Sequence, residues 1–195
     1  MRYRFLFLCV YLAAALLPAG VLAQPTKDAP KLLGTFGGWK ANSDGAGDQL
    51  TCYMTLQMHS LPNKKLKRGA AWLSITDRPG ENSRNVVSYT AGYNFKPTSS
   101  VTVLIGKKSF DLFTEKDTAW SRDAATDHAL AVAIRDGVKM KITGTPAAKG
   151  AGPVSDTLDL KGAAAAYQAI GKACGYPEEA PPKSVSPTKQ KRRAQ

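Results

Sequence analysis

Short runs of alternating apolar and polar residues, separated by turn residues about every ten positions, dominate the middle of the chain. Such a period of two places successive side chains on opposite faces of a strand and is typical of half-buried sheets. Turn signals at Pro79-Gly80 and Asp136-Gly137 interrupt the runs, and Gly106-Lys107-Lys108-Ser109 is expected to close a hairpin. The pattern predicts a mainly β chain, a single-domain β-sandwich or barrel-like fold. Strands are expected at residues 52–58, 72–76, 85–93, 101–105, 110–113, 138–143 and 157–160.

Two alanine-rich segments depart from this alternation. Residues 127–135 favour a short helix that stops at the following Asp136-Gly137. Residues 163–174 favour a second, C-terminal helix, because its apolar residues recur at spacings of three and four. That spacing places four residues on one face, which is expected to dock on the sheet: Ala166, Tyr167, Ile170 and Cys174.

The N-terminus has the three parts of a secretory signal. Two arginines precede an unbroken apolar run from Phe5 to Leu17, Pro18 interrupts it, and Val21-Leu22-Ala23 supplies the small residues of a cleavage site before Gln24. Residues 1–23 are therefore predicted to be a signal peptide. At about 13 residues the run is shorter than the roughly 20 that span a bilayer, so no transmembrane span is expected after cleavage. An uncleaved N-terminal anchor is the alternative.

Export changes the cysteine count. Cys9 lies inside the signal and leaves with it, and Cys52 and Cys174 remain in an oxidising compartment, where an even pair predicts a disulfide. The bridge would close a loop of roughly 120 residues, worth about 4–5 kcal/mol in the chain-entropy model. Two reactive or metal-binding thiols are the alternative, but the sequence has no Cys-x-x-Cys spacing and no histidine near either cysteine.

Composition divides the exported chain into three parts. Residues 24–36 form a polar entry segment, residues 37–177 the β domain, and residues 178–195 a tail rich in proline, serine and lysine. The tail has almost no large apolar residue to offset its ordering entropy and is predicted to be disordered.

The chain is strongly basic, with a formal net charge of +12. One cluster, Lys64, Lys65, Lys67 and Arg68, precedes the expected strand at 72–76, and a second, Lys189, Lys191, Arg192 and Arg193, lies in the tail. In an exported protein these charges indicate anionic envelope or host-cell surfaces as partners rather than nucleic acid. Both clusters are therefore candidate anionic-surface contacts. The alternative is that they are merely solvated.

Catalytic and metal-binding patterns are weak. Asp123, Asp127 and His128 resemble a base with an orienting carboxylate, but a triad also needs a positioned nucleophile, and Ser121 is the one nearby candidate. A zinc site needs three or four ligands, which His59 and His128 do not supply. We therefore expect no catalytic residues, no metal and no cofactor, and an unrecognised hydrolase is a minor alternative.

Taken in order, these features resemble the invasion-associated locus B family of exported bacterial proteins. The resemblance covers roughly Gly37 to Gly175 and ends in a helix with Cys174. Its segments are Trp39 followed by Cys52, Leu73-Ser74-Ile75-Thr76, Val103-Leu104-Ile105-Gly106, Phe110-Asp111-Leu112, Ala119-Trp120, Ala133-Ile134-Arg135-Asp136-Gly137, Ile142-Thr143-Gly144-Thr145 and Asp156-Thr157-Leu158-Asp159-Leu160-Lys161-Gly162.

The resemblance implies a non-enzymatic protein of the periplasm, the outer envelope or the exterior, from a family whose founding members are associated with entry into host red cells. It carries over no catalytic residue. The basic residues 64–68 and the basic tail are additions to the shared pattern. Many relatives occur in free-living bacteria, so a periplasmic structural or stress-supporting role without an extracellular partner is the alternative to a virulence role.

Overall fold

The computed structural model describes residues 29–58 and 66–176. Within them ten strands and two helices make one unit, in which every strand pair is antiparallel. The strands join one sheet in the order β1-β2-β3-β4-β5-β8-β7-β6-β9-β10. The elements are β1 (Lys31–Phe36), β2 (Trp39–Asp44), β3 (Thr51–Met58), β4 (Ala71–Arg78), β5 (Ser83–Thr90), β6 (Ser100–Ile105), β7 (Lys108–Glu115), β8 (Thr118–Trp120), α1 (Ala124–Asp136), β9 (Lys139–Gly144), β10 (Val154–Asp159) and α2 (Ala163–Ala173).

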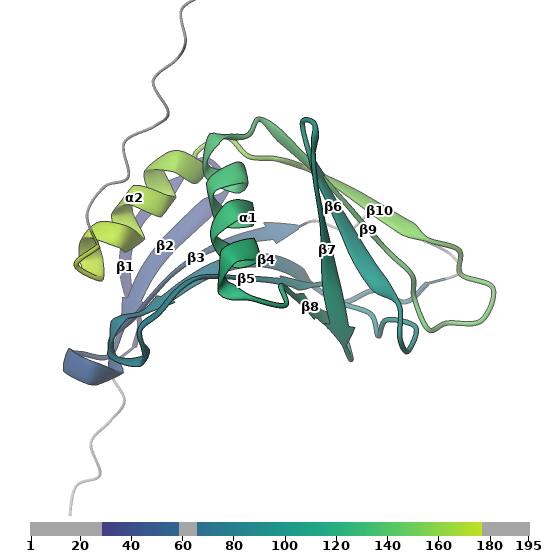
Figure 1. Ribbon diagram of the computed structural model, residues 1–195, viewed down its shortest axis with the longest axis horizontal. Coiled ribbons are helices and arrows are strands. Elements are labelled where there is room, and N and C mark those ends of the chain that lie inside the picture. The colour runs from purple at the N-terminus through teal and green to yellow at the C-terminus, as the bar shows by residue number, and fades with distance from the viewer. Residues whose placement is uncertain (1–28, 59–65, 177–195) are drawn as a thin grey trace, which may run out of the picture.

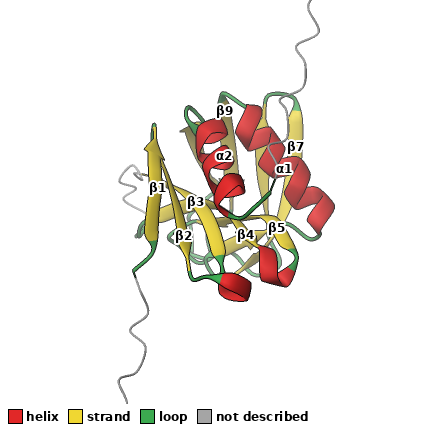
Figure 2. Ribbon diagram, turned by 90° about the vertical axis from the view of Figure 1, so that its left-hand side faces the viewer, coloured by secondary structure: helices red, strands yellow, loops and turns green. Residues whose placement is uncertain are grey.

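The sheet is strongly curved, and both helices lie on its concave side (Figure 1). Figure 2 shows α1 and α2 side by side over the strands. The two ends of the sheet approach each other where the β1–β2 turn meets the β10–α2 turn. There Gly162 has φ of +92°, and a Cβ atom on it would overlap the carbonyl oxygen of Phe36. The expected mainly β, barrel-like fold with a short C-terminal helix is confirmed.

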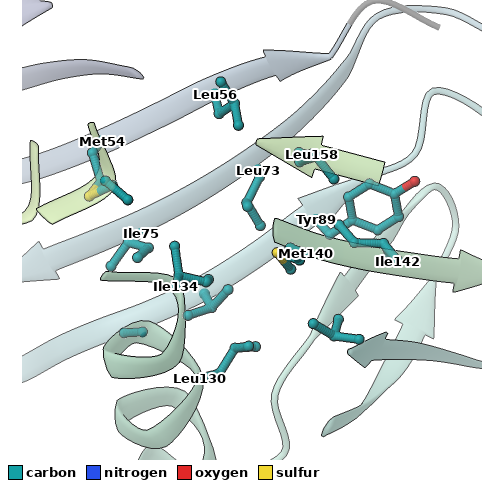
Figure 3. Close-up of a cluster of buried hydrophobic side chains, with 14 of the residues drawn as sticks. Met54, Leu56, Leu73, Ile75, Tyr89, Leu130, Ile134, Met140, Ile142 and Leu158 are labelled. Carbon is teal, nitrogen blue, oxygen red and sulfur yellow. The ribbon is translucent and has the colours of Figure 1, made fainter. Parts of the chain in front are cut away.

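Alternation creates the core. On β4 every second side chain is buried, and β3, β5, β6 and β9 bury alternate residues in the same way over most of their length. Because the sheet bends around, Leu73 of β4 faces Met140 of β9 and Leu158 of β10 across the interior, with Ile134 of α1 beside them (Figure 3). These side chains are 5% exposed or less. The curved sheet thus has one continuous core.

The folded unit begins earlier than expected. Residues 24–36 were predicted to be an entry segment, yet Lys31–Phe36 pairs with β2 as the edge strand of the sheet. The β structure therefore starts before residue 37. The short strands β2 and β8 were not predicted either. The expected signal at 1–23 and the tail at 178–195 lie outside the described residues.

Both predicted helices are present, with ends within three residues of those expected. Helix α1 begins three residues earlier than expected, because Asp123 caps it by accepting a hydrogen bond from the Thr126 amide at 2.8 Å. Helix α2 buries Ala166, Tyr167 and Ile170 against the sheet. The predicted disulfide joins Cys52 on β3 to Cys174 at the end of α2, across 122 positions of sequence.

Candidate functional site

The structure describes only two of the four residues in the basic cluster predicted at 64–68, Lys67 and Arg68. Lys64 and Lys65 lie outside the described residues, as do all four cations of the tail cluster. Lys67 is exposed and borders a shallow hollow of about 700 Å³. Arg68 differs, because its side chain is only 8% exposed.

The guanidinium of Arg68 holds a partly buried ion pair. Its Nη1 donates to Asp156 Oδ1 at 2.7 Å, its Nη2 to Oδ2 at 2.5 Å, and its Nε to the carbonyl of Ala91 at 2.7 Å. The Tyr89 hydroxyl donates to the same carboxylate at 2.6 Å, and the guanidinium lies 5.4 Å from the Tyr93 ring centre. Since the carboxylate is bound bidentately, Arg68 joins the segment before β4 to β10 inside the protein.

The pKa shifts of the groups around Arg68 agree with a charged Arg68–Asp156 ion pair. Burial acts to raise the pKa of Asp156, but the hydrogen bonds from Arg68 and Tyr89 and the positive charge of Arg68 outweigh it and lower the pKa. Burial, and next the bond to Asp156, raises the pKa of Tyr89. Burial also raises the pKa of Tyr93 to about 12. The aspartate is therefore charged and both tyrosines are neutral at neutral pH.

A second polar cluster is centred on Asn85, which is 1% exposed and has φ of +63°. The backbone N–H of Asn85 donates to Asp77 Oδ1 at 2.7 Å, and its side-chain Oδ1 accepts from the Tyr167 hydroxyl at 2.8 Å. Its Nδ2 lies 2.9 Å from Nδ1 of His128. Because Oδ1 accepts from tyrosine, Nδ2 is the donor to histidine. Asn85 thus ties β4, α1 and α2 together.

The three residues considered as a catalytic group make structural hydrogen bonds instead. Asp123 caps α1, Asp127 accepts a hydrogen bond from the Val87 amide at 2.9 Å, and His128 bonds to Asn85. Burial raises the pKa of Asp127, against the lowering effect of the Val87 bond. Among the described residues, no cluster of three or more histidine, cysteine, aspartate or glutamate side chains is arranged to hold a metal.

A basic surface that the sequence did not reveal lies where three turns meet, at the upper edge of Figure 1. We call it the lysine rim. The turns are β6–β7, α1–β9 and β10–α2, and the Leu160 amide donates to the Val138 carbonyl at 2.9 Å, which joins the last two. The rim consists of five exposed lysines, Lys107, Lys108, Lys139, Lys141 and Lys161.

Nearby carboxylates do little to neutralise the lysine rim. Asp136 is held by Arg135, whose Nε and Nη2 donate to it at 2.7 and 2.9 Å. The bond from Arg135 lowers the pKa of Asp136, and the charge of Lys108 adds to this effect. Asp159 accepts a hydrogen bond from the Lys161 amide at 2.8 Å. Because five lysines outnumber these two carboxylates, one of them already paired with an arginine, the edge is positively charged.

A groove of about 720 Å³ follows α2. Two of its cations lie over aromatic rings, Arg84 at 4.5 Å from the Tyr176 ring centre and Arg135 at 5.6 Å from that of Tyr167. Such contacts stabilise the packing of the helix. Much of the groove wall consists of small side chains, and the described residues that line it do not form a catalytic set.

A family model described as invasion associated locus B (IalB) protein matches residues 39–171. The chain belongs to the invasion associated locus B family. The crystal structure of invasion associated protein B from Bartonella henselae is similar, with a TM-score of 0.52 and 17% sequence identity, covering 75% of this chain and 98% of that one. At this identity the likeness shows a shared fold. No curated protein sequence matches the chain.

The part of the chain matched by the invasion associated locus B model includes Asn85, Arg68 and the whole lysine rim. Cys174 lies three positions beyond its end. Neither the family description nor the name of the Bartonella henselae protein mentions a catalytic activity. Within the described residues, no helix has the length and apolar character needed to cross a membrane.

Proposed function

We propose that this invasion associated locus B protein is an exported, non-enzymatic protein of the cell envelope whose positively charged surface contacts an anionic partner. The lysine rim carries the proposal, because five exposed cations on neighbouring strands and turns add up where single ones do little. The net charge supports it: it is +12 for the full sequence and remains about +10 once Arg2 and Arg4 leave with the signal (12 − 2).

Export is supported by the signal-like N-terminus and by the Cys52–Cys174 disulfide, since such bonds persist in oxidising compartments. A non-enzymatic role is supported by the structural bonds of Asp123, Asp127 and His128. The word invasion in the name of the similar Bartonella henselae protein supports a host-cell surface as one candidate for the anionic partner.

The first experiment locates the protein. Protease is added to intact bacteria and to cells with an opened outer membrane, and cleavage of the protein is followed by immunoblot. Cleavage on intact cells supports contact with an external surface. Protection until the membrane is opened restricts the anionic partner to the periplasm and favours the structural or stress-supporting role.

The second experiment measures charge contact directly, as retention on a sulfated polysaccharide resin over a salt gradient. We expect retention that weakens as salt rises, because exposed charge contacts are screened. Replacing Lys107 and Lys108 by glutamine should shorten retention more than replacing Lys31 and Lys40, two exposed lysines on the first strands of the sheet. Equal effects of the two pairs would show that net charge, not the lysine rim, causes retention.

A further inference from the structure

Exposed apolar side chains lie next to the lysine rim. Three large apolar side chains of the described residues are exposed: Val138 at 74%, Leu32 at 57% and Leu104 at 43%. Leu32 lies on edge strand β1, whereas Val138 and Leu104 are neighbours of rim lysines. Single exposed apolar residues are ordinary, but two of these three lie beside the same group of cations and form a defined surface with it.

The geometry places charge directly beside apolar surface. Leu104 on β6 is the cross-strand partner of Lys141 on β9, so their side chains are neighbours on one face of the sheet. Val138 immediately precedes Lys139 and borders a groove of about 540 Å³ that is also lined by Ile105, Lys107 and Lys108. The groove wall therefore combines aliphatic side chains with ammonium groups.

This combination decides the class of partner. A sulfated or acidic polymer attracts the lysines but offers no apolar phase to Val138 or Leu104. A bilayer that contains anionic phospholipids offers both phosphate groups at its surface and acyl chains just below. Lysine stems also pack along apolar surface while their ammonium groups remain at the phosphates.

We propose that the lysine rim docks on the surface of an anionic phospholipid bilayer, with Val138 and Leu104 entering the headgroup layer. This inference rests on the proposed function and names the anionic partner. Docking is peripheral. The β6–β7 hairpin and the α1–β9 turn approach the membrane first. The C-terminal end of α2 lies away from these two turns (Figure 1), and it carries Cys174 of the disulfide.

The test is co-sedimentation of the full exported chain, tail included, with phosphatidylcholine vesicles that contain or lack phosphatidylglycerol. Each lysine near an anionic surface contributes about fivefold to partitioning, so Lys107→Gln with Lys108→Gln should weaken binding about 25-fold. The matched pair Lys31→Gln with Lys40→Gln makes the same change in net charge on the first strands of the sheet. The loss of vesicle affinity in this control pair should be several-fold smaller than the loss in the rim pair.

The apolar contribution is tested separately. Val138→Ser should weaken vesicle binding about three- to tenfold, whereas Leu32→Ser, which removes an exposed apolar side chain outside the rim, should have little effect. Circular dichroism checks that each variant is folded. The same variants are passed over the sulfated polysaccharide resin, where Val138→Ser should leave retention unchanged.

Four outcomes separate the hypotheses. Vesicle binding that is weakened clearly more by the rim pair than by Lys31→Gln with Lys40→Gln, and more by Val138→Ser than by Leu32→Ser, supports docking on lipid. Binding to anionic vesicles that is insensitive to the rim variants overturns the site. A third outcome is that the lysine pair weakens both vesicle binding and resin retention while Val138→Ser weakens neither. This result overturns the lipid partner and leaves the proposed function standing. Absence of binding to both vesicles and resin overturns the proposed function itself.

Discussion

Replacing Arg68 by methionine separates a structural role from a surface role for this residue. The substitution keeps the length of the aliphatic stem but leaves the Asp156 carboxylate, 17% exposed, without its bidentate partner. Breaking a buried pair at one end costs about 3–5 kcal/mol. Because Asp156 keeps the hydrogen bond from Tyr89, we expect a loss of about 3 kcal/mol in the free energy of unfolding. Equilibrium urea unfolding at neutral pH measures it.

A neighbouring residue provides the control. Lys67→Met removes one positive charge from an exposed side chain one position earlier, and such surface changes stay within about 0.5 kcal/mol. The double variant Arg68→Met with Asp156→Leu should recover part of the loss, because no unpaired carboxylate remains. If Arg68→Met is as stable as Lys67→Met but shortens retention on the anionic resin, the structural interpretation is refuted and the sequence-based one holds.

The pH dependence has a defined sign. The pKa of Asp156 is lowered in the folded protein, so its contribution is present above the unfolded pKa of about 3.9 and is lost as pH falls through the folded pKa. In Arg68→Met the hydrogen bonds from arginine, which lower the pKa of Asp156, are gone, while burial still raises that pKa. The difference in stability between wild type and variant should therefore shrink below about pH 4. A difference that stays constant there would contradict the assignment to this ion pair.

Three further predictions test the fold. Replacing Cys52 and Cys174 by alanine should cost about 5 kcal/mol, since the bridge spans 122 positions, and a reductant should lower the urea midpoint of wild type but not of this variant. Gly162→Ala should cost about 2 kcal/mol or more in urea unfolding, while Gly150→Ala, where φ is also positive but the space is open, should cost less. Tyr167→Phe removes the donor to a buried amide oxygen and should cost about 1–2 kcal/mol in the same assay.

Strands with one buried face could be predicted from sequence, because alternation reports that face directly. This holds for β4, where apolar Leu73 and Ile75 alternate with Ser74 and Thr76. It fails at β2, which buries Trp39 and Ala41 and leaves its second half partly exposed. It also fails at β1, the edge strand, where none of the six residues is fully buried. Short or edge strands owe their position to pairing with neighbours, which local pattern does not encode.

The candidate site was less predictable than the fold. Arg68 was assigned to a surface cluster because its charge is visible in sequence, whereas its partner Asp156 is 88 positions away. The lysine rim depends on the strand order β7-β6-β9-β10, which brings Lys107, Lys139 and Lys161 from separate turns to one edge. The adjacent Lys107 and Lys108 were seen only as part of a turn. Nothing local to them indicates the exposed Val138.

The two helices on the concave face affect where a partner can bind. Both helices fill that face (Figure 2), and Asn85 and the disulfide fix α2 to the sheet. The turns of the lysine rim are anchored by the same elements: Gly137 ends α1, and the carbonyl of Val138 bonds to Leu160. Since the lysines project from paired strands and from the turns between these elements, docking orders side chains but not backbone, which lowers its entropic cost. Binding should then follow the charge and apolar area of the rim, the two quantities that the paired variants change independently.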